Sequence, residues 1–264
     1  MEVEKVTNHI VSWLKDYATK ANVNGFVIGI SGGIDSAVTS TLCALTGLEV
    51  LCLEMPIHQG ENQVSRAKEH INQLKKKYTK VSSLEINLTN TFETFIKAVP
   101  KEKKSDKVDL SLANTRARLR MTSLYYFAGL NGLLVAGTGN KVEDFGVGFF
   151  TKYGDGGVDL SPIADLLKSQ VYILAKHLNV PKSIQKAQPT DGLFGDTRTD
   201  EDQIGASYDE LEWAMQMKEE GKTITSFEGR KAKVFKIYQS RHNANKHKMV
   251  AIPVCEIPKE LFSF

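Results

Sequence analysis

Apolar residues follow two alternating spacings along the chain, one typical of helices and one typical of buried strands. From Val3 to Lys20 they recur every three or four residues, which predicts an amphipathic helix. Gly25–Ile30 is a short β-branched apolar run, which predicts a buried parallel strand. Further strands are predicted over Val50–Glu54, Ser83–Leu88 and Leu133–Gly137. Further helices are predicted over Ser36–Leu45, Glu61–Tyr78, Asn90–Val99, Leu112–Leu130, Ile163–Leu178, Glu210–Lys218 and Lys231–Asn245.

Strands that alternate with helices indicate an α/β fold, in which a parallel sheet has helices on both faces in a Rossmann-like arrangement. Residues 1–264 contain no internal repeat and no Pro- or Ser-rich linker, so we expect a single domain over 1–264. In such sheets ligands bind at the carboxyl ends of the strands. The segments that follow the predicted strands are therefore the candidates for a functional site.

Composition and charge narrow the function classes. The 264 residues carry 34 Lys and Arg against 31 Asp and Glu, a net charge of +3. This balance does not indicate binding to nucleic acid or to a membrane surface. No stretch approaches the roughly 18 apolar residues of a membrane span. The three cysteines form no CxxC pair, which argues against a zinc, iron–sulfur or redox site and favours a reducing, cytoplasmic location.

The clearest chemical signal is Ser-Gly-Gly-Ile-Asp-Ser at 31–36, between the first predicted strand and the next helix. Glycines let the backbone approach an anion, and the helix start directs free N–H groups and a positive dipole end at it. Asp35 would repel a bound phosphate unless a cation lay between them, so this carboxylate implies Mg²⁺. Helix capping by Asp35 or Ser36 is the alternative. Two glycines between a buried strand and a helix favour the anion site.

This loop resembles the pyrophosphate-binding loop of the N-type ATP pyrophosphatases, which cleave ATP between its α- and β-phosphates and adenylate an oxygen. Within that superfamily, residues 133–168 resemble the NAD synthetases, above all in the run FFTKYGDGGVDLSPI at 149–163. The similarity extends from the first helix to His247 and Lys248. The resemblance implies an adenine-nucleotide-hydrolase-like fold and a ligase that amidates deamido-NAD (nicotinate adenine dinucleotide).

The resemblance also implies roles for individual residues, with Asp35, Lys152 and Asp159 as the catalytic candidates. Taken singly, Glu143, Lys168 and Arg118 are typical of solvated surface charges, so their roles depend on the resemblance. The residues implied to bind ATP are Gly29, Ile30, Ser31, Gly32, Gly33, Ile34, Asp35, Ser36, Thr138, Lys168 and Thr190. Those implied to bind deamido-NAD are Arg118, Lys152, Asp159, His247 and Lys248, and those implied to bind magnesium are Asp35 and Glu143.

The implied reaction consists of two displacements in one site. The nicotinate carboxylate attacks the α-phosphorus of ATP and pyrophosphate leaves; ammonia then attacks the acyl adenylate and AMP leaves. Most of the catalysis would come from positioning and charge stabilisation. We expect ammonia as the direct donor, because the synthetase-like part fills these 264 residues and leaves none for a glutamine amidase. The resemblance further implies a homodimer, with deamido-NAD bound across the subunit interface.

Two other functions stay open. One is another enzyme of the same superfamily, acting on tRNA or a GMP precursor, although a tRNA thiolation enzyme would require reactive cysteines and a strongly basic surface. The other is a nucleotide-binding module without catalysis, which would lack paired acids such as Asp35 and Glu143. Pyrophosphate release from ATP that requires both deamido-NAD and Mg²⁺ would distinguish the NAD synthetase function from both.

The polar, turn-rich segment Gln188–Gly205 predicts a mobile lid over ATP, with Thr190 at its start. Three large apolar residues cannot bury enough surface to offset the entropy of ordering it. Closure over a nucleotide would exclude water from the acyl adenylate. Val81–Ser83 and the charged run Lys101–Lys107 are also expected to be mobile without ligand.

Overall fold

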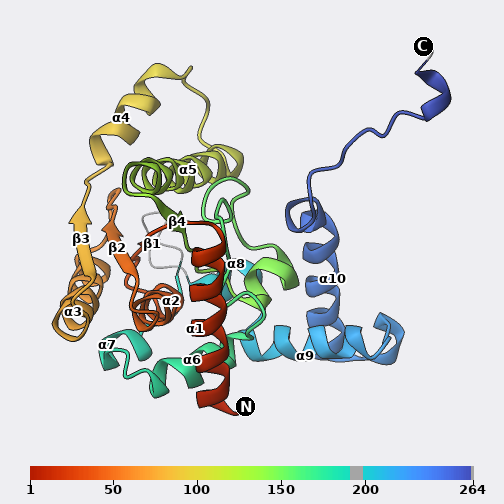
Figure 1. Cartoon of the computed structure of the whole chain (residues 1–264). Helices are drawn as coiled ribbons and strands as arrows, with labels where there is room; N and C mark the ends of the chain where they lie inside the picture. Colours follow the sequence, from red (N-terminus) through yellow and green to blue (C-terminus); the bar gives the residue numbers. More distant parts are fainter. Residues whose placement is uncertain (191–198, 263–264) are drawn as a thin grey trace.

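The centre of the molecule is a parallel sheet, seen in a computed structural model that describes residues 1–190 and 199–262 (Figure 1). Its strands are β1 (Gly25–Gly29), β2 (Glu49–Glu54), β3 (Val81–Glu85) and β4 (Leu133–Val135), in the order β3-β2-β1-β4. All three strand pairs are parallel, so their carboxyl ends lie at one edge. This edge carries the loop that follows β1.

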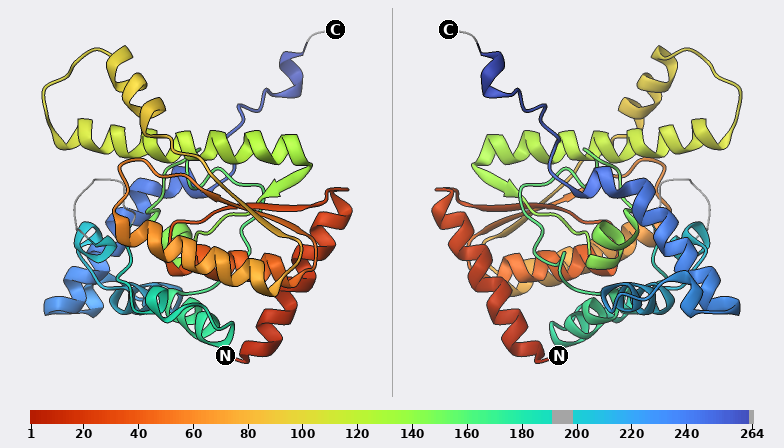
Figure 2. Two further views of the ribbon diagram at one scale, coloured as in Figure 1. Left: turned by 90° about the vertical axis from the view of Figure 1, so that its left-hand side faces the viewer. Right: turned by 90° about the vertical axis from the view of Figure 1, so that its right-hand side faces the viewer.

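Helices cover both faces of the sheet, and the predicted fold class is confirmed (Figure 2). Side chains alternate across the sheet, so Phe26 and Ile28 belong to one core cluster and Val27 to the other. The first cluster includes residues of α1 (Val3–Lys20), α2 (Ile34–Leu45), α3 (Glu61–Lys77) and α6 (Lys168–His177). The second includes residues of α4 (Thr89–Ala98) and α5 (Asp106–Asn131).

A third core cluster lies beside these layers and consists of helices (Figure 1). It joins the π-helix η1 (Val142–Val147) to α9 (Tyr208–Glu219) and α10 (Gly229–Met249), around Leu211 and Phe235. The remaining short helices are α7 (Lys182–Gln185), α8 (Asp200–Ile204), η2 (Ile224–Ser226) and η3 (Lys259–Leu261). A single domain over 1–264 stays a prediction. No described helix is long and apolar enough to cross a membrane.

Most predicted helices and strands form, but several bounds differ from the prediction. α5 begins at Asp106 rather than at Leu112, because the Ser105 side chain caps it by accepting a hydrogen bond from the Val108 N–H. The end of the predicted charged loop is therefore helical. β3 begins at Val81 rather than at Ser83 and pairs with β2, so Val81–Ser83 belongs to the sheet. The mobility expected there without ligand stays a prediction.

Two differences bear directly on the site. The helix predicted from Ile163 begins only at Lys168, where the Leu167 N–H donates to the Gln170 Oε1 at 2.8 Å. Lys168 is therefore at a helix start rather than within a helix. The π-helix η1 was not predicted at all, although it carries Glu143. His247 lies in the last turn of α10 rather than in a tail beyond it.

Candidate active site

The loop at 31–36 connects β1 to α2 and holds its shape through its own hydroxyl groups. The Ser36 Oγ donates to the Gly33 carbonyl at 3.0 Å and accepts from the Ser31 N–H at 3.3 Å. The Ser31 Oγ accepts from the Gly33 N–H at 3.2 Å. Gly32 has a φ of +78°, and a Cβ there would lie 2.4 Å from the Gln63 carbonyl oxygen. Glycine is therefore required both by the backbone conformation and by the close approach of α3.

Lys168 lies between Asp35 and Glu143, the two acids that the resemblance implies as magnesium ligands. Its Nζ donates to the Asp35 Oδ2 at 2.6 Å and to the Glu143 Oε1 at 2.8 Å. The Lys168 side chain is 3% exposed, whereas those of Asp35 and Glu143 are 17% and 16% exposed. The structure thus brings together one residue from the start of α2, one from η1 and one from the start of α6.

Burial and mutual attraction set the charges of this group. Burial raises the pKa of Asp35, and the ammonium of Lys168 offsets this only in part. Burial acts in the same direction on Glu143, but the charge and hydrogen bonds of Lys168 and a bond from Tyr208 hold its pKa below the usual value. Burial would lower the pKa of Lys168, yet the two carboxylates raise it above the usual value. Lys168 therefore carries its positive charge throughout the physiological pH range.

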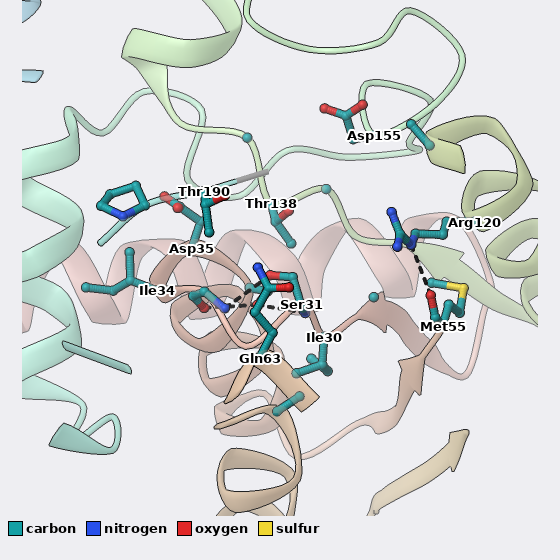
Figure 3. Close-up of a pocket in the computed structure, with 18 of the residues that line it drawn as sticks. Ile30, Ser31, Ile34, Asp35, Met55, Gln63, Arg120, Thr138, Asp155 and Thr190 are labelled. Carbon is teal, nitrogen blue, oxygen red and sulfur yellow. Dashed lines mark hydrogen bonds between the residues drawn. The ribbon is translucent and has the colours of Figure 1, made fainter. Parts of the chain in front are cut away.

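A cavity opens beside this group at the carboxyl edge of the sheet (Figure 3). All the residues predicted to bind ATP line it except Gly32. Thr138 lines it from the loop after β4, and Thr190 lines it from the segment after α7. Residues 191–198 of the predicted lid lie outside the described residues, whereas 200–204 of that segment form α8. Closure of Gln188–Gly205 over a nucleotide stays a prediction.

The residues predicted to bind deamido-NAD do not line this cavity. Three of them form a chain beside it. The Arg118 guanidinium donates to the Lys152 carbonyl at 3.3 Å, and the Lys152 Nζ donates to the His247 carbonyl at 2.9 Å. Lys248 donates to the carbonyls of Gly148 and Phe150. These hydrogen bonds connect α10 to the loop at 148–152.

Asp159 also lies apart from the cavity lining, and its carboxylate is already engaged. Its Oδ1 accepts from the Tyr125 hydroxyl at 3.0 Å and its Oδ2 accepts from the Val135 N–H at 2.8 Å. Burial, followed by the hydrogen bond to Asp159, raises the pKa of Tyr125 to about 12. These contacts fix Asp159 at the end of β4, facing α5.

Two residues of the site have no sequence signal of their own. The buried Asn140 side chain donates to the Asp35 Oδ1 at 3.0 Å and accepts from the Glu143 N–H at 3.1 Å. It therefore links the glycine loop to η1. The Tyr208 hydroxyl donates to the Glu143 Oε1 at 2.5 Å, and the Lys168 Nζ lies 4.7 Å from the centre of its ring. Burial, then Glu143, raises the pKa of Tyr208, so its hydroxyl remains a donor.

Comparison with known proteins identifies the family. Residues 6–251 match the NAD synthase family. The chain belongs to the NAD synthase family. An NH(3)-dependent NAD(+) synthetase of Methanosarcina mazei is 36% identical over 263 residues, 97% of this chain and 100% of the relative. Like the relatives that match it, this member of the NAD synthase family is a ligase that forms a carbon–nitrogen bond.

Two solved structures of related proteins share the fold over almost the whole chain. An NMN synthetase from Francisella tularensis superposes with a TM-score of 0.83 at 32% identity, covering 98% of this chain and 99% of its own. An NH3-dependent NAD synthetase from Campylobacter jejuni gives 0.77 at 27% identity, covering 97% and 100%. The chain is thus similar to proteins named for two different products.

Proposed function

We propose that this chain catalyses the ATP-dependent amidation of deamido-NAD to NAD with ammonia. The observation that carries the proposal is the group Lys168, Asp35 and Glu143 beside the glycine loop, in a member of the NAD synthase family. Such an arrangement suits a reaction that breaks a phosphoanhydride, because it sets fixed charges around the place where phosphate charge develops.

The reaction needs two bond exchanges. A carboxylate oxygen of deamido-NAD bonds to the α-phosphorus of ATP, and the bond from that phosphorus to the bridging oxygen breaks, releasing pyrophosphate. Ammonia then bonds to the acyl carbon, the bond to the adenylate oxygen breaks and AMP leaves. The nitrogen loses its extra proton to solvent. The acyl adenylate that forms in the first exchange is sensitive to water and is consumed in the second, so the site must hold both substrates together.

The residues at the carboxyl edge suit the first of these steps. The loop offers the free N–H groups at the start of α2 to the pyrophosphate. Lys168 has three N–H donors and gives two to Asp35 and Glu143, which leaves the third for a phosphate oxygen of ATP. Asn140 and Tyr208 keep the two carboxylates in place while this occurs.

Asp35 and Glu143 also fit a bound Mg²⁺. This ion usually takes one or two protein carboxylates and completes its shell with water and substrate phosphates. Both carboxylates face one ammonium, so together with Lys168 they carry a net negative charge that a divalent cation would balance. Mg²⁺ bound there would neutralise charge on the phosphates. Among the described residues no cluster of three or more His, Cys, Asp or Glu forms an independent metal site.

We also propose that the protein is a homodimer in which the partner completes the deamido-NAD site. The support is that Arg118, Lys152 and His247 gather outside the cavity. α5, which carries Arg118, also presents apolar side chains at its surface, with Tyr126 and Leu130 64% and 65% exposed. Light scattering on the purified chain tests the dimer. The free, buried thiols of Cys43 and Cys52 support a cytoplasmic location.

A second candidate substrate is the corresponding mononucleotide, which the same amidation would convert to NMN. The observation that favours it is the TM-score of 0.83 with the Francisella tularensis NMN synthetase. Both candidates share the carboxylate, the adenylation and the ammonia step. Only the second nucleotide of the acceptor distinguishes them.

The test is pyrophosphate release from ATP by the purified chain. Release should require a nicotinate acceptor and Mg²⁺ together, and glutamine free of ammonia should not replace ammonium in forming the amide. The rate should rise towards mildly alkaline pH, because only neutral ammonia has a lone pair for the attack. Release of pyrophosphate without any nicotinate acceptor would contradict the proposal.

A further inference from the structure

The charge of the cavity calls for a cationic side chain at the phosphates in addition to the implied Mg²⁺. Seven acidic side chains and three basic ones line it among the described residues. The polyphosphate of ATP would add several more negative charges. The glycine loop at 31–36 contains no lysine or arginine, unlike a Walker A loop, where a lysine reaches the phosphates.

Two of the three basic residues are committed to other contacts. Lys168 is bound by Asp35 and Glu143. The Arg120 guanidinium donates to the Met55 carbonyl at 3.0 Å and to the Gln59 Oε1 at 2.8 Å, and in Figure 3 it lies at the opposite side of the cavity from the loop. Because both already bind protein oxygen atoms, neither can neutralise the β- and γ-phosphates with its full charge.

The third, Arg66, lies at the loop itself. α3 packs so closely on the loop that a Cβ at Gly32 would meet Gln63. From the next turn of this helix the half-buried Arg66 reaches the loop, and its Nε donates to the Gly32 carbonyl at 3.1 Å. This bond holds the guanidinium at the loop. The structure shows no carboxylate paired with Arg66 among the described residues, and the terminal N–H groups of arginine form the fork that suits phosphate.

We propose that Arg66 binds the β- and γ-phosphates of ATP and the pyrophosphate that leaves, an inference that rests on the proposed function. When the bond between the α-phosphorus and the bridging oxygen breaks, the electron pair remains on the pyrophosphate. The guanidinium, held at Gly32, neutralises this growing charge. Arg66 is therefore a catalytic residue for the adenylation step and has no part in the ammonia step.

The experiment compares Arg66→Gln and Arg66→Lys with Lys76→Gln, which removes the same charge from an exposed position on α3. Magnesium pyrophosphate and AMP serve as probes, each measured by calorimetry and as an inhibitor of the amidation. Arg66→Gln should weaken pyrophosphate binding about tenfold or more, as expected for a charged hydrogen bond. AMP, which lacks the β- and γ-phosphates, should bind within twofold of the wild type. Arg66→Lys should restore part of the loss, and Lys76→Gln should change neither.

The two probes separate the proposal from a structural role. Unchanged pyrophosphate binding in Arg66→Gln would overturn it. Equal weakening of pyrophosphate and AMP would also overturn it, because that pattern indicates a distorted loop. Calorimetry needs no acceptor, so pyrophosphate binding can be tested even if deamido-NAD and the mononucleotide both fail as substrates. That failure would contradict the proposed function and leave the result for Arg66 standing.

Discussion

Replacing Lys168 with Met removes the ammonium that joins Asp35 to Glu143 and keeps a similar side-chain volume. Two carboxylates within 3 Å of a common point would then face each other with exposures of only 17% and 16%. Removing one partner of a buried ion pair costs about 3–5 kcal/mol, because the remaining charge loses its compensation. We expect the free energy of unfolding at neutral pH to fall by about that amount in the absence of divalent cations.

The loss of stability in the Lys168→Met variant should depend on pH and should become smaller as the pH falls. Without the ammonium the folded-state pKa values of Asp35 and Glu143 should rise above those of the unfolded chain. The folded variant then binds more protons than the unfolded chain, so its stability relative to the wild type should recover as the pH falls through the raised pKa values. Mg²⁺ should also recover stability if both carboxylates hold it.

Urea unfolding, followed by circular dichroism at several pH values with and without Mg²⁺, measures these effects. The matched control is Lys141→Met, which removes a lysine that contacts Asp165 at 3.3 Å where the acid is 98% exposed. This control should be indistinguishable from the wild type, because exposed pairs contribute little. Equal urea midpoints for the Lys168→Met variant and the wild type would refute the account of the site.

Three further outcomes are expected. Asp35→Asn should abolish pyrophosphate release while the urea midpoint shifts by less than that of Lys168→Met, and near-normal activity would exclude Asp35 as a metal ligand. Gly32→Ala should weaken ATP binding and lower stability by about 1–3 kcal/mol, because its φ of +78° and the 2.4 Å approach to Gln63 leave no room for a Cβ; unchanged binding would contradict this. Burial lowers the pKa of His70 to about 4. Its neutral ring therefore stabilises the fold above the unfolded pKa of about 6.5, and roughly 3 kcal/mol should be lost as the pH falls to about 4, a slope that His70→Gln should remove.

Local patterns predicted the fold because each element has its own signal. The helix Val3–Lys20 begins and ends where the apolar spacing predicts. The loop at 31–36 was predicted from two glycines between a buried strand and a helix. Asp35 was recognisable for the same reason. A carboxylate in a phosphate-binding loop repels the phosphate unless a cation lies between them, and this can be read from the local sequence.

The remaining site depends on contacts far apart in sequence. Tyr208 meets Glu143 across 65 positions, and Lys168 meets Asp35 across 133. The π-helix that aims Glu143 has no periodic signal, because its geometry is set by Asn140 and by packing on α9 and α10. Arg66 resembles any polar residue of an amphipathic helix until α3 is placed against the loop.

The central claim is tested most directly by the product formed from ATP, ammonium and a nicotinate acceptor. The purified chain should be given deamido-NAD and the corresponding mononucleotide, separately and in competition, with mass spectrometry of the amide products and kcat/KM for each acceptor. The account predicts NAD from deamido-NAD, one AMP and one pyrophosphate for each amide, and the higher kcat/KM for deamido-NAD. A higher kcat/KM for the mononucleotide, with NMN as the main product in competition, would contradict it.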